Sequence, residues 1–161
     1  MVVVAVTQPS EIDQAQAFEV ERYKYILQQL HTVNENVYRF LAIYQTLATL
    51  LVGAALTLFV RYDDWKIEPA VARIGIVAIL LLVTVIAAFT ILLIVVGVLT
   101  WLDYRREECE LTEEAVRPGY RKPPDPKNFW RWYETYIVLF ILGSVGFMWL
   151  GAALFLLPAM T

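Results

Sequence analysis

Three long apolar runs, separated by polar segments, dominate this chain of 161 residues. They cover residues 37–60, 70–102 and 136–160. Each run is long enough to cross the hydrocarbon core of a bilayer, which takes about 20 helical residues. Because backbone amides inside a bilayer need internal partners, each run should be a helix. The pattern predicts an all-α integral membrane protein with three transmembrane helices.

The polar segments complete the expected organisation. Residues 1–36 should form a cytoplasmic lead and an amphipathic helix, and residues 61–69 a short external loop. Residues 103–135 should form a cytoplasmic helix extension and a basic, Pro-rich loop. Transmembrane helices then occupy residues 37–60, 70–102 and 136–161.

The amphipathic helix and the first span are expected to be continuous. Residues 1–9 read as a weakly ordered lead, and Ser10 is a good N-cap. From residue 11 to 60 the only glycine or proline is Gly53, so nothing interrupts the helix.

The part of this helix before the membrane carries a heptad-like apolar stripe at Tyr23, Ile26, Leu30 and Val33. Such a stripe is typical of a helix that lies on the membrane or packs on the central loop. It is equally typical of a helical bundle between subunits.

The second run should continue as a helix to about Val116, where Pro118 and Gly119 end it. Residues 103–114 carry six acidic and two basic side chains. The charged residues in 117–131 are five basic ones and one acid. Four prolines in the same stretch predict an extended segment.

Charge distribution predicts the orientation. The N-terminal segment and the central loop lie on one side of a three-span protein, and with Arg39 at the start of the first span they carry ten of the 13 Lys and Arg residues. Because Lys and Arg concentrate in cytoplasmic segments, both should be cytoplasmic and the C-terminus external.

Composition narrows the chemistry. The chain has one cysteine, Cys109, and one histidine, His31, which leaves little scope for a metal site. No phosphate-binding loop or nucleophile motif is present in the sequence. We therefore expect no enzyme activity, no cofactor and no metal.

Small and hydroxylated residues form a stripe on one face of the first span. On this face or beside it lie Gln45, Thr46, Thr49, Gly53 and Thr57. In a membrane such a stripe indicates close helix packing, and it also suits the wall of a narrow aqueous path. The five residues are our pore-lining candidates.

Polar residues flank the first span and are pore-mouth candidates. They are Asn34, Glu35 and Asn36 on the cytoplasmic side and Asp63 and Asp64 on the external side. Carboxylates repeated around an axis would attract cations. The alternatives are an interfacial anchor for the first group and an ordinary solvated turn for the second.

Basic and aromatic residues alternate from the end of the second run to the start of the third. Guanidinium groups that neutralise phosphates and rings that stack on bases make a nucleotide or oligonucleotide site. The positive-inside rule and an interfacial aromatic belt would produce the same residues. The candidates are Arg105, Arg106, Arg117, Tyr120, Arg121, Lys122, Lys127, Trp130 and Arg131.

The layout resembles that of small membrane effectors of prokaryotic anti-phage defence, namely SLATT-type proteins and the channel subunits of Hailong-type operons. The resemblance rests on the helical run at residues 21–36, which leads into residues 38–45 and the first span, and on the basic loop before the third helix. It implies a prokaryotic inner membrane location and an operon-encoded nucleotidyltransferase whose product controls the channel. SLATT proteins generally have two spans, so the third span is a departure.

One three-span chain cannot enclose a pore, so we expect a homo-oligomer. The function that we expect is a gated ion channel or pore-forming effector, possessing a cytoplasmic part that senses a nucleotide or oligonucleotide. The alternative is a non-conducting accessory or scaffold subunit of a larger membrane complex. A membrane-bound nucleic-acid receptor without conductance is a third hypothesis.

Overall fold

The computed structural model describes residues 11–160, apart from the side chains of residues 11–13, 15 and 126. Within this range the chain is helical and contains no strand, which confirms the expected all-α class. The lead at residues 1–9, the N-cap at Ser10 and the last residue of the third span lie outside the described residues.

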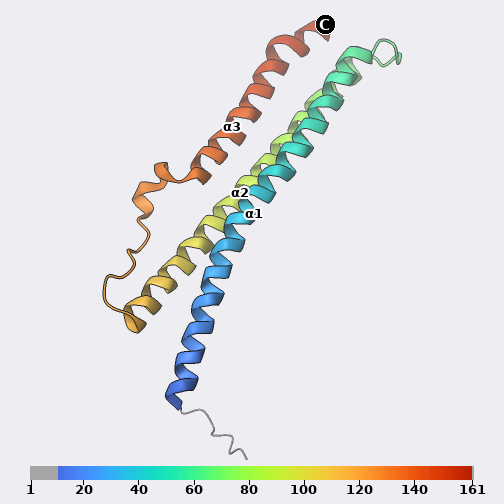
Figure 1. The fold of residues 1–161 in the computed structure, drawn as a ribbon. Helices are drawn as coiled ribbons and strands as arrows, with labels where there is room; N and C mark the ends of the chain where they lie inside the picture. The colour runs from blue at the N-terminus through green and yellow to red at the C-terminus, as the bar shows by residue number, and fades with distance from the viewer. Residues whose placement is uncertain (1–10, 161) are drawn as a thin grey trace, which may run out of the picture.

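Two very long helices form an antiparallel hairpin (Figure 1). Helix α1 runs from Glu11 to Arg61 and α2 from Pro69 to Ala115, without a break in either. The expected continuity of the amphipathic helix with the first span is thus confirmed. At about 1.5 Å per residue, α1 is roughly 76 Å long, which exceeds the thickness of a bilayer core more than twofold.

A tight turn joins the two helices. The amide of Trp65 donates to the carbonyl of Arg61 at 3.0 Å, and that of Ile67 donates to Tyr62 at 2.8 Å. Lys66 takes a left-handed backbone conformation, with φ of 55°. The two chain directions therefore reverse within residues 62–68.

The third helix covers only one part of the hairpin (Figure 1). Helix α3 runs from Tyr133 to Gly151, three residues earlier than the expected start of the span. A π-helical turn, η2 (Ala152–Leu156), and a short 3-10 helix, η3 (Pro158–Met160), follow it. In the described part, three helices are long and apolar enough to cross a membrane.

The rest of the hairpin, residues 11–33 of α1 and 103–115 of α2, extends beyond the start of α3, and we call it the projecting end (Figure 1). Its apolar stripe is used inside the chain, because Ile26 and Leu30 are buried against Leu111 of α2. The stripe therefore packs on the segment that follows the second span, which is one of the alternatives that the sequence left open.

The loop after α2 returns along the hairpin to α3 (Figure 1). Gly119 has φ of +72°, a conformation that a glycine adopts without strain. The segment expected to be extended contains a 3-10 helix, η1 (Pro126–Arg131). Asp125 stabilises the start of this helix, because its carboxylate accepts from the amide of Lys127 at 3.0 Å.

Polar contacts fix α3 against the hairpin within the apolar region. The buried hydroxyl of Tyr44 lies 2.7 Å from the Ser144 hydroxyl, which itself donates to the carbonyl of Ile141. Tyr44 is therefore the donor. Nearer the other end, the Trp149 indole donates to the Thr84 hydroxyl at 3.0 Å.

Aromatic pairs join the three helices where α3 begins, and we call this region the aromatic junction. Tyr38 of α1 stacks on Tyr133, with ring centroids 5.5 Å apart and planes inclined by 2°. Trp101 of α2 meets Trp132 edge-on at 6.3 Å. All four residues lie within a few positions of an apolar run's end, as aromatic residues do at a membrane interface.

Candidate functional site

The centre of the small, polar stripe of α1 lies opposite the face that packs on α2, while Gln45 and Thr49 lie at its edge beside α3. Gln45, Thr46, Thr49, Gly53 and Thr57 are all exposed. The buried positions of the same helix segment, Val37, Tyr44 and Ala55, lie on the opposite side, against α2 and α3. Close packing on α2 therefore does not account for the stripe.

Two of the three hydroxyl groups of the stripe donate to their own helix, whereas the hydroxyl of Thr49 and the amide of Gln45 have no hydrogen bond to a described residue. Thr46 donates to the carbonyl of Ala42 at 2.9 Å and Thr57 to that of Gly53 at 2.8 Å. The side chain of Gln45 makes no hydrogen bond to any described residue. Gln45 and Thr49 line a groove of about 330 Å³ between α1 and α3.

The three pore-mouth candidates that precede the first span point in different directions. Glu35 lies 3.2 Å from His31, and both are exposed. Seven-residue steps from Glu35 lead through position 42 to Thr49, so Glu35 shares the face of the stripe. Asn34 instead accepts a long hydrogen bond, 3.5 Å, from the hydroxyl of Tyr133, and Asn36 is half-buried.

The other pair of pore-mouth candidates lies at the opposite end of the hairpin. Asp63 and Asp64 are exposed in the turn between α1 and α2. The turn therefore presents two carboxylates to solvent.

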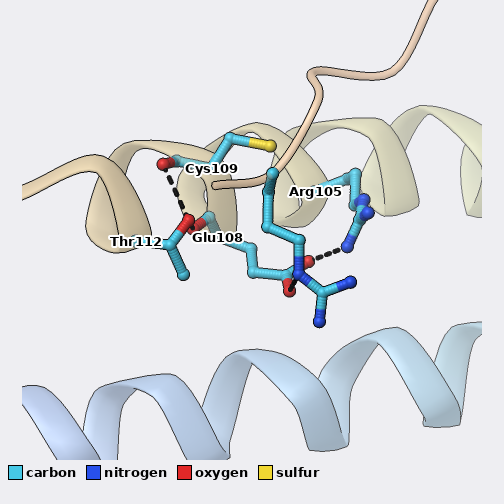
Figure 2. Close-up of polar contacts among 5 residues, drawn as sticks. Arg105, Glu108, Cys109 and Thr112 are labelled. Atoms are coloured by element: carbon cyan, nitrogen blue, oxygen red, sulfur yellow. Dashed lines mark hydrogen bonds and ion pairs between the residues drawn. The ribbon is translucent and has the colours of Figure 1, made fainter. Parts of the chain in front are cut away.

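Among the ligand-binding candidates, two arginines are held by a buried carboxylate (Figure 2). Glu108 of α2 is completely buried. Arg105, one turn earlier on the same helix, forms an ion pair with it. Arg121 reaches it from the loop, with Nε 3.3 Å from Oε1, although the two atoms are not aligned as a hydrogen bond.

Arg121 also reaches the first helix, so it connects three segments. A hydrogen bond with Tyr23 of α1 raises the pKa of Arg121, and the charge of Glu108 raises it further. The guanidinium is therefore permanently cationic. The ring of Tyr120 lies 6.0 Å from this group and 5.9 Å from that of Arg117.

The remaining candidates are dispersed. Arg106 is exposed, 4.0 Å from Asp103. Lys122 and Lys127 are exposed, and Trp130 rests on Phe129 with centroids 4.9 Å apart. Arg131 lines a cavity at the aromatic junction. The structure thus brings together Arg105, Arg117, Tyr120 and Arg121 and leaves the others separate.

Beside that group, an apolar cleft of about 370 Å³ opens between the two helices of the projecting end. Tyr23 and Tyr120 belong to its wall, together with Val20, Leu111 and Val116. Glu19 and Lys24 also line it. The cleft is large enough for a small ligand, for which pockets start at about 300 Å³.

Glu108 and Tyr23 were not among the residues singled out from the sequence as ligand-binding candidates. A signal existed for Glu108, because it lies four residues after Tyr104 and three before Leu111, both on the packing face of α2. A carboxylate in that register is expected to be buried and therefore paired.

The described residues contain no candidate metal site, and the comparisons with known proteins find no relative. In the described part of the chain, no three His, Cys, Asp or Glu residues are grouped to hold a metal ion. Comparison with protein-family models, with curated proteins and with solved structures finds no match to this chain.

Proposed function

We propose that this membrane protein is the subunit of a homo-oligomeric gated ion channel in a prokaryotic inner membrane. The observation that carries the proposal is the exposed stripe of α1, and above all Gln45. A side-chain amide facing lipid has nothing to hydrogen-bond, which costs free energy. A water-filled axis between several copies of α1 removes this penalty.

In this proposal the stripe lines the axis, and Glu35 forms a ring at its mouth. Carboxylate rings favour cations, so the channel is cation-tolerant. The Lys and Arg distribution orients the projecting end toward the cytoplasm. Asp63 and Asp64 then lie at the external end.

The signal in this proposal is a nucleotide or oligonucleotide that binds at the loop. Its phosphates would compete with Glu108 for Arg121, while its base would enter the apolar cleft beside Tyr23 and Tyr120. The resemblance to defence effectors suggests an operon-encoded nucleotidyltransferase as the source. Neutralising Arg117 and Arg121 together should abolish salt-dependent binding of such a signal.

A non-conducting scaffold subunit is the second candidate, and open glycine faces on α1 and α3 are compatible with it. Gly143 and Gly146 of α3, like Gly53 of α1, have no atom of the chain within 4 Å of an added Cβ. These faces are open to helices of another protein as readily as to a second copy.

The mass of the detergent-solubilised protein, expressed alone, separates the two candidates. A channel subunit gives one discrete oligomer by native mass spectrometry, whereas a scaffold subunit gives a monomer or a polydisperse mixture. A monomer in both detergent and nanodiscs would overturn the channel proposal.

Ion flux in liposomes tests which residues line the axis. We expect Gln45→Leu and Thr49→Val to lower cation flux several-fold, because both remove polar groups from the conducting path. Thr100→Val is the matched control, since Thr100 is a partly exposed threonine of α2 that is hydrogen-bonded to its own helix. Equal flux for all three variants would contradict the assignment of the stripe.

A further inference from the structure

Two cavities adjoin where α3 begins. The first, of about 300 Å³, is lined mainly by polar and aromatic residues, among them Asn34, Trp101 and Arg131. The second, of about 320 Å³, runs between α2 and α3 and is lined mainly by apolar residues. Their walls share Val98, Trp132 and Glu134, so a polar head and an apolar tail lie next to each other.

The polar head contains one charge of each sign. Arg131 supplies a guanidinium and Glu134 a carboxylate, and neither forms an ion pair within the described chain. The amide oxygen of Asn34 accepts from Tyr133, which leaves its NH₂ group available to donate. The indole rings of Trp101 and Trp132 form aromatic walls on which a small cation can rest.

The apolar tail lies along the hydrophobic segments. Val95 and Leu99 of α2 face Leu139 of α3 across it. All three side chains are exposed in the monomer. The head lies at the ends of the three apolar runs, and the tail extends from there toward the bilayer centre.

We propose that this site binds one phosphatidylethanolamine molecule. Its phosphate accepts from Arg131 and Asn34, its ammonium lies at Glu134 against the indole rings, and an acyl chain fills the tail. A neutral pair of charges suits a zwitterionic headgroup. An anionic headgroup without an amine would bring a second negative charge next to Glu134.

Titration of delipidated protein with single lipids, followed by native mass spectrometry, tests the proposal. We expect phosphatidylethanolamine to bind about tenfold more tightly than phosphatidylglycerol. Arg131→Gln should weaken phosphatidylethanolamine binding about tenfold, because it removes a charge-assisted hydrogen bond. Lys127→Gln, at an exposed cation of the same 3-10 helix, should change nothing.

Further variants separate the head from the tail. Glu134→Gln should remove the preference for phosphatidylethanolamine over phosphatidylglycerol. Leu99→Trp fills the tail and should weaken binding of both lipids, whereas Leu92→Trp, at an exposed α2 position outside the site, should not. Unchanged helicity in circular dichroism establishes that each variant is folded.

Two results would overturn the proposal. Equal affinity of the native chain for both lipids, unaffected by Arg131→Gln, would identify ordinary annular lipid. Displacement of phosphatidylethanolamine by an equal concentration of soluble glycerophosphoethanolamine would identify a phosphodiester site that does not use the tail.

Discussion

Glu108 is the residue whose environment departs most from expectation. A carboxylate with no exposure to solvent is stabilised only if cations and hydrogen-bond donors surround it. Here Arg105 comes from its own helix and Arg121 from a distant part of the chain. One buried charge therefore ties the loop to the hairpin.

Replacing Glu108 should release the loop. We expect Glu108→Gln to lower stability by about 1–3 kcal/mol, because it leaves two arginines without their carboxylate. Trypsin should then cleave faster after Arg121 and Lys127, two loop cations that are not followed by proline. Thermal unfolding in detergent and timed proteolysis measure the two effects.

Glu110→Gln is the control for this prediction, since Glu110 lies on the same helix but is exposed. If both variants are cleaved at the native rate, the ion pairs of Glu108 do not hold the loop.

Among the long helices, α3 contacts the smallest part of the rest of the chain. The hairpin helices contact each other along their length, while α3 meets them over a single segment. Two polar contacts, Tyr44 with Ser144 and Trp149 with Thr84, fix its register. Interhelical hydrogen bonds of this kind contribute about 0.6 kcal/mol on average in membranes.

Removing the Tyr44 hydroxyl should loosen α3 and leave the hairpin intact. We expect Tyr44→Phe to destabilise the protein by about 0.6 kcal/mol, and up to about 1.7 kcal/mol, because Ser144 loses its donor. Thermal unfolding compared with that of Tyr136→Phe measures this, since Tyr136 is an exposed tyrosine of α3. Identical midpoints for the two variants would show that the contact does not stabilise α3.

The long elements could be predicted from the sequence, while their mutual contacts could not. The lack of Gly and Pro before Gly53 predicted α1, and Pro118 with Gly119 marked the end of α2. Those signals are local. Asn34 and Glu35 look equivalent in the sequence, yet one faces α3 and the other the polar stripe, because the position of α3 decides which side is covered.

The loop shows the same limit. Its prolines predicted an extended segment, but Asp125 caps a 3-10 helix within it. The basic residues could be recognised as a group, although nothing local indicated that Arg105 and Arg121 would pair with one buried carboxylate. Such pairing depends on how the chain folds back over α2.

For the whole molecule, the predicted topology has a direct test. With the projecting end in the cytoplasm, Asp64→Cys should react with a membrane-impermeant thiol reagent on intact spheroplasts. Lys127→Cys should react only after permeabilisation. The native Cys109 is buried and gives little background. The reverse pattern of labelling would invert the orientation that we infer from the Lys and Arg distribution.

The two uninterrupted helices make the hairpin a stiff rod that extends on both sides of the aromatic junction. About 35 Å of α1 lies on one side of the aromatic junction and about 40 Å on the other. Between Glu11 and Gly53 the helix has no proline or glycine at which to bend, and α2 stiffens it. For any rotation about the junction, the two arms are nearly equal. A sideways displacement of the projecting tip would therefore move the turn at residues 62–68 in the opposite direction, at almost the same amplitude.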